Sequence, residues 1–136
     1  MPPIVDQPEA YFLNFVPPRD ELLQRLEAEA TLEEIPIVGP VVGELLYILA
    51  RAAEARRILE LGTATGYSAI YLGRAVAATG GRLVTLESHR EMARRAEANL
   101  REAGLAEVAE VVCGDALEVL AAAPADYDFP DFDENT

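Results

Sequence analysis

The sequence has no lysine or tryptophan, and it has only one cysteine (Cys113) and one histidine (His89). A single cysteine excludes an internal disulfide, and one cysteine with one histidine cannot form a Cys/His zinc site. Against 24 acidic residues stand 11 basic ones, all arginine, which gives a formal charge of −13. Such an acidic surface does not attract a phosphate backbone, so we do not expect general nucleic-acid binding.

Long apolar runs are also missing. The longest stretch, residues 35–50, contains two prolines, two glycines and Glu44, and it is too short to span a bilayer. The chain does not open with a basic segment followed by an apolar one, so no secretory signal is identified. Together with the cysteine content, this predicts a soluble, cytoplasmic protein without a membrane partner.

The 136 residues are 51% apolar, which suits one domain with a real core. Residues 1–54 predict an N-terminal helical arm. A helix start at Asp20 follows two prolines, and apolar residues then recur at helical spacing over 22–30 and again over 41–53. Residues 55–136 form the second unit.

Within residues 55–136, strand and helix patterns alternate. Strands are predicted at 58–61, 83–86 and 108–113, with a fourth from Tyr127. Helices are predicted over 69–78, ended by glycines 80 and 81, and from a capping box of Ser88 with Glu91 to Gly104. Asp115 is predicted to cap a further short helix. This alternation predicts an α/β fold with a parallel sheet and helices on both faces, which binds ligands at the carboxyl ends of its strands.

The first strand ends in ELGTATGYS at residues 60–68. Its glycines allow close approach of the backbone to a ligand, although such turns also serve tight packing alone. The dinucleotide fingerprint G-x-G-x-x-G is not met, because Ala64 and Tyr67 replace its second and third glycines. Glu60 adds a carboxylate that suits a sulfonium or an ammonium group better than a pyrophosphate.

The next two strands also end in acidic residues. Glu87 follows the glycine turn at the spacing of a residue that binds ribose hydroxyls, and its other interpretation is a solvated charge near a helix N-terminus. Asp115 could accept a hydrogen bond from an adenine amine, with Ala116 against the ring, and could cap a helix at the same time.

These motifs resemble the class I S-adenosylmethionine-dependent O-methyltransferases. The run ILELGTATGYS at 58–68 and GDA at 114–116 are most similar to the metal-dependent catechol and caffeoyl-CoA O-methyltransferase-like family, including its bacterial members. FVPPRD at 15–20 and PIVGP at 36–40 resemble that family's N-terminal arm. The resemblance runs from Pro8 to about Phe129.

The resemblance implies a Rossmann-like fold and in-line transfer of a methyl group to a hydroxyl of a small acceptor, with a divalent metal, usually magnesium, that binds the acceptor. It also implies a homodimer. The cofactor-binding residues it implies are Val38, Glu60, Gly62, Thr63, Gly66, Ser68, Glu87, Ser88, Asp115 and Ala116.

The last residues depart from the family pattern. Aligned without a gap, Asp133 falls on a metal-ligand position; aligned with a gap, that ligand loop is absent. Pro130 opposes a regular fourth strand, because proline cannot donate to the ladder. In either alignment the later metal ligands and the acceptor pocket are missing, so we expect a chain truncated after strand four, with an apolar edge open to pairing.

Two other functions are open at this point: a non-catalytic cofactor-binding or dimerising remnant, and an NAD-binding fragment of an oxidoreductase. Tyr11, Phe12 and Phe15 are expected in the core or an interface. Cys113 is expected as a buried filler, and His89 as a surface residue.

Overall fold

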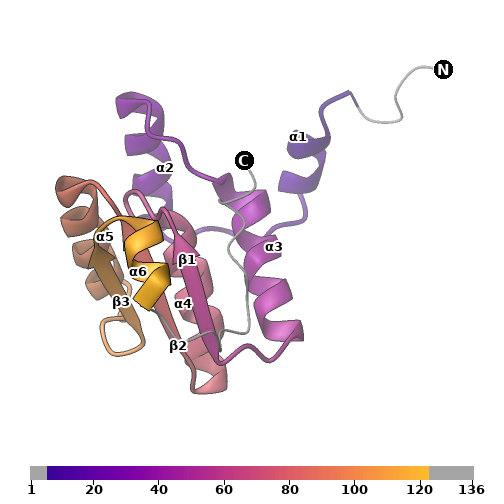
Figure 1. The fold of residues 1–136 in the computed structure, drawn as a ribbon. Coiled ribbons are helices and arrows are strands. Elements are labelled where there is room, and N and C mark those ends of the chain that lie inside the picture. Colours follow the sequence, from indigo (N-terminus) through magenta and orange to yellow (C-terminus); the bar gives the residue numbers. More distant parts are fainter. Residues whose placement is uncertain (1–5, 123–136) are drawn as a thin grey trace.

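A computed structural model describes residues 6–122 of the chain, and three parallel strands form its centre (Figure 1). They are β1 (Arg57–Leu61), β2 (Arg82–Glu87) and β3 (Ala109–Cys113), in the order β1-β2-β3. Glu60 of β1 is level with Thr85 of β2, and Glu87 is level with Cys113 of β3. The three strand predictions are confirmed, whereas the fourth, from Tyr127, lies outside the described residues.

Six helices accompany these strands within residues 6–122. They are α1 (Pro8–Leu13), α2 (Glu21–Glu33), α3 (Gly39–Ala52), α4 (Tyr67–Thr79), α5 (Arg90–Glu102) and α6 (Ala116–Ala122). None of these helices combines the length and the apolar character needed to cross a bilayer.

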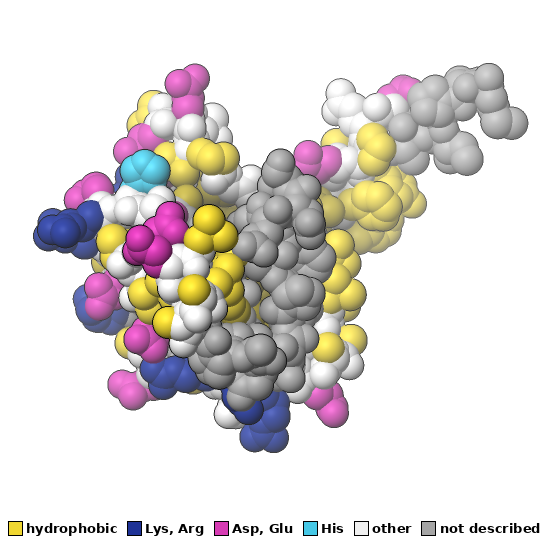
Figure 2. Space-filling view, viewed as in Figure 1, with side chains coloured by type: hydrophobic (Ala, Val, Ile, Leu, Met, Phe, Trp, Pro, Cys, Tyr) yellow, Lys and Arg dark blue, Asp and Glu magenta, His cyan; other side chains and the backbone are white. Residues whose placement is uncertain are grey.

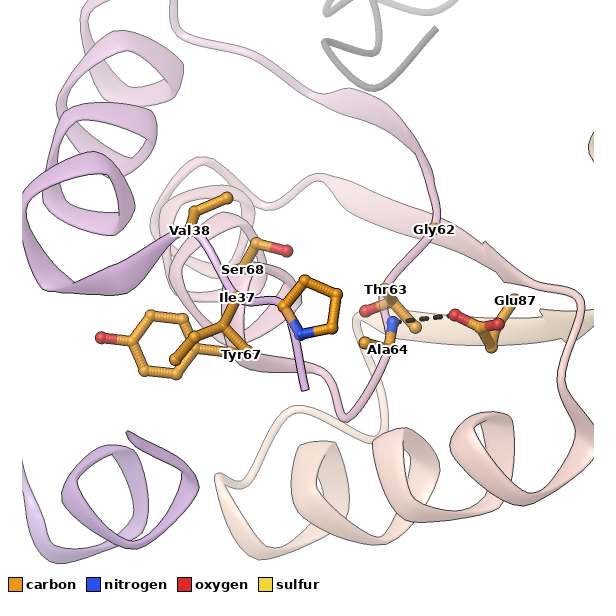
Figure 3. A pocket seen from close by; sticks show the side chains of 9 residues that line it. Ile37, Val38, Gly62, Thr63, Ala64, Tyr67, Ser68 and Glu87 are labelled. Carbon is orange, nitrogen blue, oxygen red and sulfur yellow. Dashed lines mark hydrogen bonds between the residues drawn. The ribbon is translucent and has the colours of Figure 1, made fainter. Parts of the chain in front are cut away.

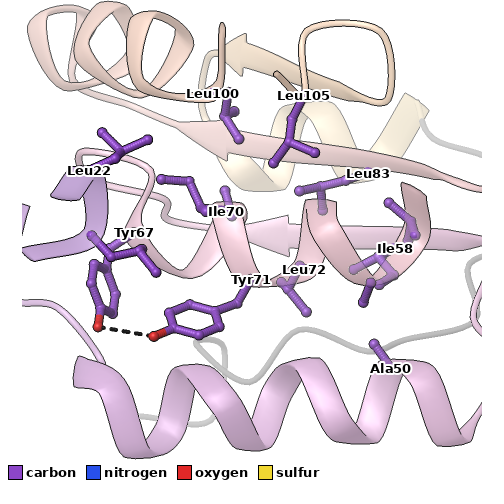
Figure 4. Packing of buried hydrophobic residues seen from close by; sticks show 14 of the residues in the cluster. Leu22, Ala50, Ile58, Tyr67, Ile70, Tyr71, Leu72, Leu83, Leu100 and Leu105 are labelled. Carbon is purple, nitrogen blue, oxygen red and sulfur yellow. Dashed lines mark hydrogen bonds between the residues drawn. The ribbon is translucent and has the colours of Figure 1, made fainter. Parts of the chain in front are cut away.

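Helices cover both faces of the sheet, as the strand–helix alternation predicts (Figure 1). Residues on one face, such as Ile58 and Leu83, pack under α4 and α5 in the larger apolar cluster (Figure 4). The alternate residues, including Leu59 and Leu86, face the opposite way and pack against Ala116, Val119 and Leu120 of α6. The fold is therefore Rossmann-like: a parallel sheet between two helical layers.

Helices α2 and α3 belong to the same core as the sheet. Leu22, Leu23 and Leu26 of α2 and Ala50 of α3 are buried in the larger cluster. The predicted helix start at Asp20 is confirmed: Asp20 is the N-cap of α2, and its side chain accepts a hydrogen bond from Leu23 N at 3.0 Å.

Other predicted helix ends are also confirmed. Gly80 ends α4 with a φ of 72°, and Gly104 follows α5 with a φ of 75°. Asp115 caps α6: its Oδ1 accepts from Leu117 N at 3.0 Å and from Glu118 N at 3.1 Å.

Two predictions are wrong. Ser88 does not form a capping box, because the N-cap of α5 is His89 and Glu87 Oε1 accepts its N–H at 2.9 Å instead. Cys113 is exposed, since it ends β3, which has a strand partner on one side only among the described strands. For Tyr11, Phe12 and Phe15, expected in the core or an interface, exposures of 46%, 52% and 70% exclude the core and leave the interface.

Gly43 allows α3 and α4 to approach closely. An ideal Cβ at Gly43 would lie less than 3 Å from three atoms of the buried Tyr71 ring. Alanine is favoured over glycine in a helix by about 1 kcal/mol, but forced overpacking costs about 1–3 kcal/mol. We therefore expect Gly43→Ala to lower the free energy of unfolding by about 1 kcal/mol, measured by urea denaturation. In a Tyr71→Leu background the same change should be neutral or stabilising; an equal loss in both backgrounds would contradict the contact.

Candidate functional site

A cavity of about 400 Å³ opens at the carboxyl ends of β1 and β2 (Figure 3). Its walls come from the segment between α2 and α3, the loop after β1 with the first turn of α4, and the end of β2. The lining residues are Pro36, Ile37, Val38, Gly62, Thr63, Ala64, Tyr67, Ser68 and Glu87. The fold rule for parallel sheets places ligands at this edge.

The loop after β1 is folded back onto β2. Gly62 N and Thr63 N both donate to Leu86 O, at 2.8 and 3.2 Å. The loop needs left-handed backbone at Gly62 (φ 82°) and Gly66 (φ 91°). A Cβ on Gly66 would lie 3.2 Å from the backbone of Ala96 in α5, so this glycine seats the loop against that helix and does not line the cavity.

Glu87 connects the loop to β2 and faces the cavity (Figure 3). Its side chain is buried, Oε2 accepts from Ala64 N at 2.8 Å, and Oε1 accepts from His89 N at 2.9 Å. An ionised carboxylate has about four acceptor positions. Capacity therefore remains for the hydroxyl groups of a ligand, in addition to these two backbone bonds.

Glu60 lies directly behind the cavity wall. It is 5% exposed, and its carboxylate accepts from Thr85 Oγ1 at 2.7 Å and from Ser68 Oγ at 2.6 Å. Ser68 lines the cavity, whereas Glu60 does not. A buried carboxylate beside a cavity favours a positively charged ligand, because its field is weakly screened there.

Thr63 carries a hydroxyl without a hydrogen-bond partner in the described structure. Thr63 Oγ1 is buried, and Thr63 lines the cavity. An unpaired buried hydroxyl costs about 1–3 kcal/mol relative to a paired one. A polar ligand group in the cavity would satisfy it, so the residues present fit a ligand with hydrogen-bonding groups.

Tyr67 was missed as a site residue by the sequence analysis. Its ring lines the cavity, and its hydroxyl donates to Glu27 Oε2 at 2.9 Å. Burial raises the pKa of Tyr67, and the neighbouring Tyr71 and Glu27 raise it further, so the hydroxyl stays protonated and remains a donor. The sequence does contain a sign of this role, because Tyr67 directly follows Gly66 and stands in the first turn of the helix after the glycine-containing loop. Pro36, Ile37 and Ala64 were missed too, although they flank Val38 and Thr63.

The ten sequence-predicted residues fall into three groups. Val38, Gly62, Thr63, Ser68 and Glu87 line the cavity, while Glu60 and Gly66 support its wall. The other three, Ser88, Asp115 and Ala116, do not line it. They follow β2 and β3 at the same edge of the sheet, where Gly114 N donates to Glu87 O at 3.1 Å.

Within residues 6–122, no three histidine, cysteine, aspartate or glutamate side chains gather where they could hold a metal ion. The metal-ligand candidate Asp133 lies outside this range. The described residues therefore do not supply the metal site that the resemblance implies, and no chemical step is derived through a metal.

The chain resembles known proteins over most of its length. Residues 18–134 match the model of a family described as O-methyltransferase. A curated relative, a catechol O-methyltransferase of Mycobacterium tuberculosis, is 40% identical over 138 residues, covering 98% of this chain and 61% of the relative.

Solved structures give the same result. An O-methyltransferase from Bacillus cereus, in complex with S-adenosylhomocysteine (SAH), is similar with a TM-score of 0.74 and 36% identity, over 83% of this chain and 52% of the other. An O-methyltransferase of Streptomyces achromogenes involved in tomaymycin synthesis, in complex with S-adenosylmethionine (SAM), has a TM-score of 0.76 and 37% identity, over 90% and 59%. The present chain thus spans about half to three-fifths of the length of these relatives.

Proposed function

Because this chain belongs to the O-methyltransferase family, we propose that its cavity binds SAM and that the protein serves O-methylation of a small hydroxylated acceptor. The observation that carries the proposal is the cavity at the carboxyl ends of β1 and β2. Glu87, with its buried carboxylate, and Thr63, with its unpaired hydroxyl, both line it. The relatives of known structure bind SAM or SAH, which supports the same ligand here.

Each end of the cavity suits a different part of this ligand. We assign Glu87 to the ribose hydroxyls and Ser88 to their neighbourhood. Gly62, Thr63 and Ser68, with Val38 opposite and Glu60 behind Ser68, are assigned to the methionine end. Asp115 and Ala116, at the end of β3, are assigned to the adenine. Gly66 completes the binding loop by seating it on α5.

When bound, SAM would supply an electrophilic methyl group, which the acceptor oxygen takes as the sulfur–carbon bond breaks. The chain's own contribution is orientation. The loop after β1 is held by Leu86 O and by Glu87, and this fixed shape would keep the cofactor aligned toward an incoming hydroxyl. We assign neither the acceptor proton nor a magnesium ion to any of the described residues.

A nicotinamide dinucleotide is not favoured. Ala64 and Tyr67 stand where its fingerprint needs glycines, and the Glu60 carboxylate next to the wall would repel a pyrophosphate.

We also propose that the protein is cytoplasmic and assembles as a homodimer through its arm. Apolar side chains gather on α1, on the residues just after it and on α3, which lies beside α1, and yellow surface is visible there at the upper right of Figure 2. They include Phe12, Phe15, Val42, Leu45 and Ile48, each more than 40% exposed. Contiguous exposed apolar surface of this kind marks association. Sedimentation velocity should give twice the mass of 14.7 kDa, and a monomer at micromolar concentration would contradict this assembly.

Calorimetric titration of the purified chain with SAM, SAH and NAD tests the proposed ligand. Heat of binding is expected with the first two and not with NAD. Binding of NAD alone would overturn the proposal, and binding of none of the three would leave a remnant without cofactor function.

A further inference from the structure

Helix α2 is hydrogen-bonded to the wall of the cavity although it contributes no residue to the lining. The first connection runs from Glu27 to Tyr67. The Tyr67 hydroxyl donates to Glu27 Oε2 at 2.9 Å, and Arg19 donates to both oxygens of Glu27 at 3.0 to 3.2 Å. Tyr67 is 1% exposed and its ring lines the cavity, with Tyr71 beside it (Figure 4). The orientation of this ring is therefore set by a residue of α2.

The second connection runs through α5. Asn99 is buried and its Nδ2 donates to Thr65 O, in the loop after β1, at 2.8 Å. The Asn99 side-chain oxygen accepts from Arg25 of α2 at 3.3 Å. This amide is thus oriented from one side by α2 and holds the loop from the other side.

Helix α2 also leads into the opposite wall. It ends at Glu33, and Pro36, Ile37 and Val38 of the cavity follow within a few residues. The loop on one side of the cavity and the segment on the other side are therefore both joined to the same helix, one by hydrogen bonds and the other by the chain.

We propose that Tyr67 and Asn99 are positioning residues through which α2 holds the loop at residues 62–66 in its binding shape, so that docking of α2 and binding of the adenosyl cofactor stabilise each other. This rests on the proposed function, because it takes the cavity as the cofactor site. Coupling between two sites is reciprocal, so a cofactor that prefers the ordered loop must also stabilise the docked helix.

The chain offers variants that separate this role from simple stability. Tyr67→Phe keeps the ring in the cavity wall and removes only the hydroxyl, and Asn99→Ala removes the bond to Thr65 O. Glu27→Gln keeps an acceptor for Tyr67 and gives up the charge that pairs with Arg19. Arg82→Ala is the control: Arg82 bonds to Glu110 of β3 at 3.0 Å, at the amino end of β2 and away from both α2 and the loop.

The dissociation constant for SAH, measured by calorimetry, is expected to rise about five- to tenfold in Tyr67→Phe and in Asn99→Ala. It should stay within twofold of the wild-type value in Arg82→Ala, and Glu27→Gln, which keeps an acceptor for Tyr67, should weaken binding less than Tyr67→Phe does. Thermal unfolding of each variant shows how much stability it has lost. If Arg82→Ala weakens SAH binding as much as Tyr67→Phe does, the effect is general and the proposal is overturned.

Hydrogen–deuterium exchange on the same proteins gives the reciprocal measurement. SAH should slow exchange of the amides of α2 in the wild-type chain and should slow it less in the Tyr67→Phe/Asn99→Ala double variant. Unchanged α2 exchange in a wild-type protein that does bind SAH overturns the coupling and leaves the proposed function standing. A wild-type protein that does not bind SAH at all refutes the proposed function itself.

Discussion

Replacing Glu87 by alanine should weaken SAM binding at least tenfold, which is about 1.4 kcal/mol or more of binding free energy. The side chain has two roles that are lost together. Its carboxylate is assigned to the ribose hydroxyls, and the same oxygens accept the N–H groups of Ala64 and His89 at 2.8 and 2.9 Å. Removing the Glu87 side chain deletes the assigned bidentate contact to the ribose. It also releases the loop after β1, which forms one wall of the cavity. Calorimetric titration of the variant with SAM measures the loss.

Two further variants make this test specific. Glu87→Gln keeps the shape of the side chain but retains only one acceptor oxygen, so it should lie between the wild type and alanine. Glu91→Ala removes an exposed carboxylate from the first turn of the same helix, α5, and should bind normally. An affinity of Glu87→Ala equal to that of Glu91→Ala would remove Glu87 from the cofactor site.

Local signals in the sequence predicted most of the described fold. The positions of β1, β2 and β3 follow from short apolar runs, and the caps at Asp20 and Asp115 follow from residue types that accept backbone N–H groups. The carboxyl ends of parallel strands share one edge, so the meeting of Gly62 with Glu87 was also predictable. These features depend on neighbours in sequence or on the handedness of the crossovers.

Features that depend on which of several possible hydrogen-bond or strand partners a residue finds in the folded chain were not predictable. Ser88 and Glu91 have the spacing of a capping box, but α5 begins one residue later, with His89 as its N-cap. The N–H of His89 donates to the Glu87 carboxylate. Tyr67 has an apolar ring at a helical position, and only its three-dimensional contact with Glu27, 40 positions earlier, shows how it is held. The exposure of Cys113 likewise depends on which strands flank β3, a property of the assembled sheet.

Glu60→Gln should discriminate between the two forms of the cofactor. SAM carries a positive charge on sulfur that SAH lacks, and Glu60 places a buried carboxylate immediately behind Ser68 in the cavity wall. At an effective dielectric constant of about 20, opposite charges within ~8 Å attract by ~2 kcal/mol. Removing the carboxylate charge should therefore raise the dissociation constant for SAM about tenfold more than that for SAH.

The ratio of the two dissociation constants is the informative quantity, because a general distortion of the cavity would weaken both ligands alike. Ser68→Ala supplies the matched control: it deletes the hydroxyl that donates to Glu60 at 2.6 Å but leaves the negative charge in place. Its ratio should stay near that of the wild type even if both affinities fall. Thr85, fully buried, also donates to Glu60 at 2.7 Å, and a glutamine can still accept that bond, so the variant is expected to remain folded. A folded Glu60→Gln protein with an unchanged ratio would show that the carboxylate serves the packing of β1 against β2 and not the recognition of the sulfonium.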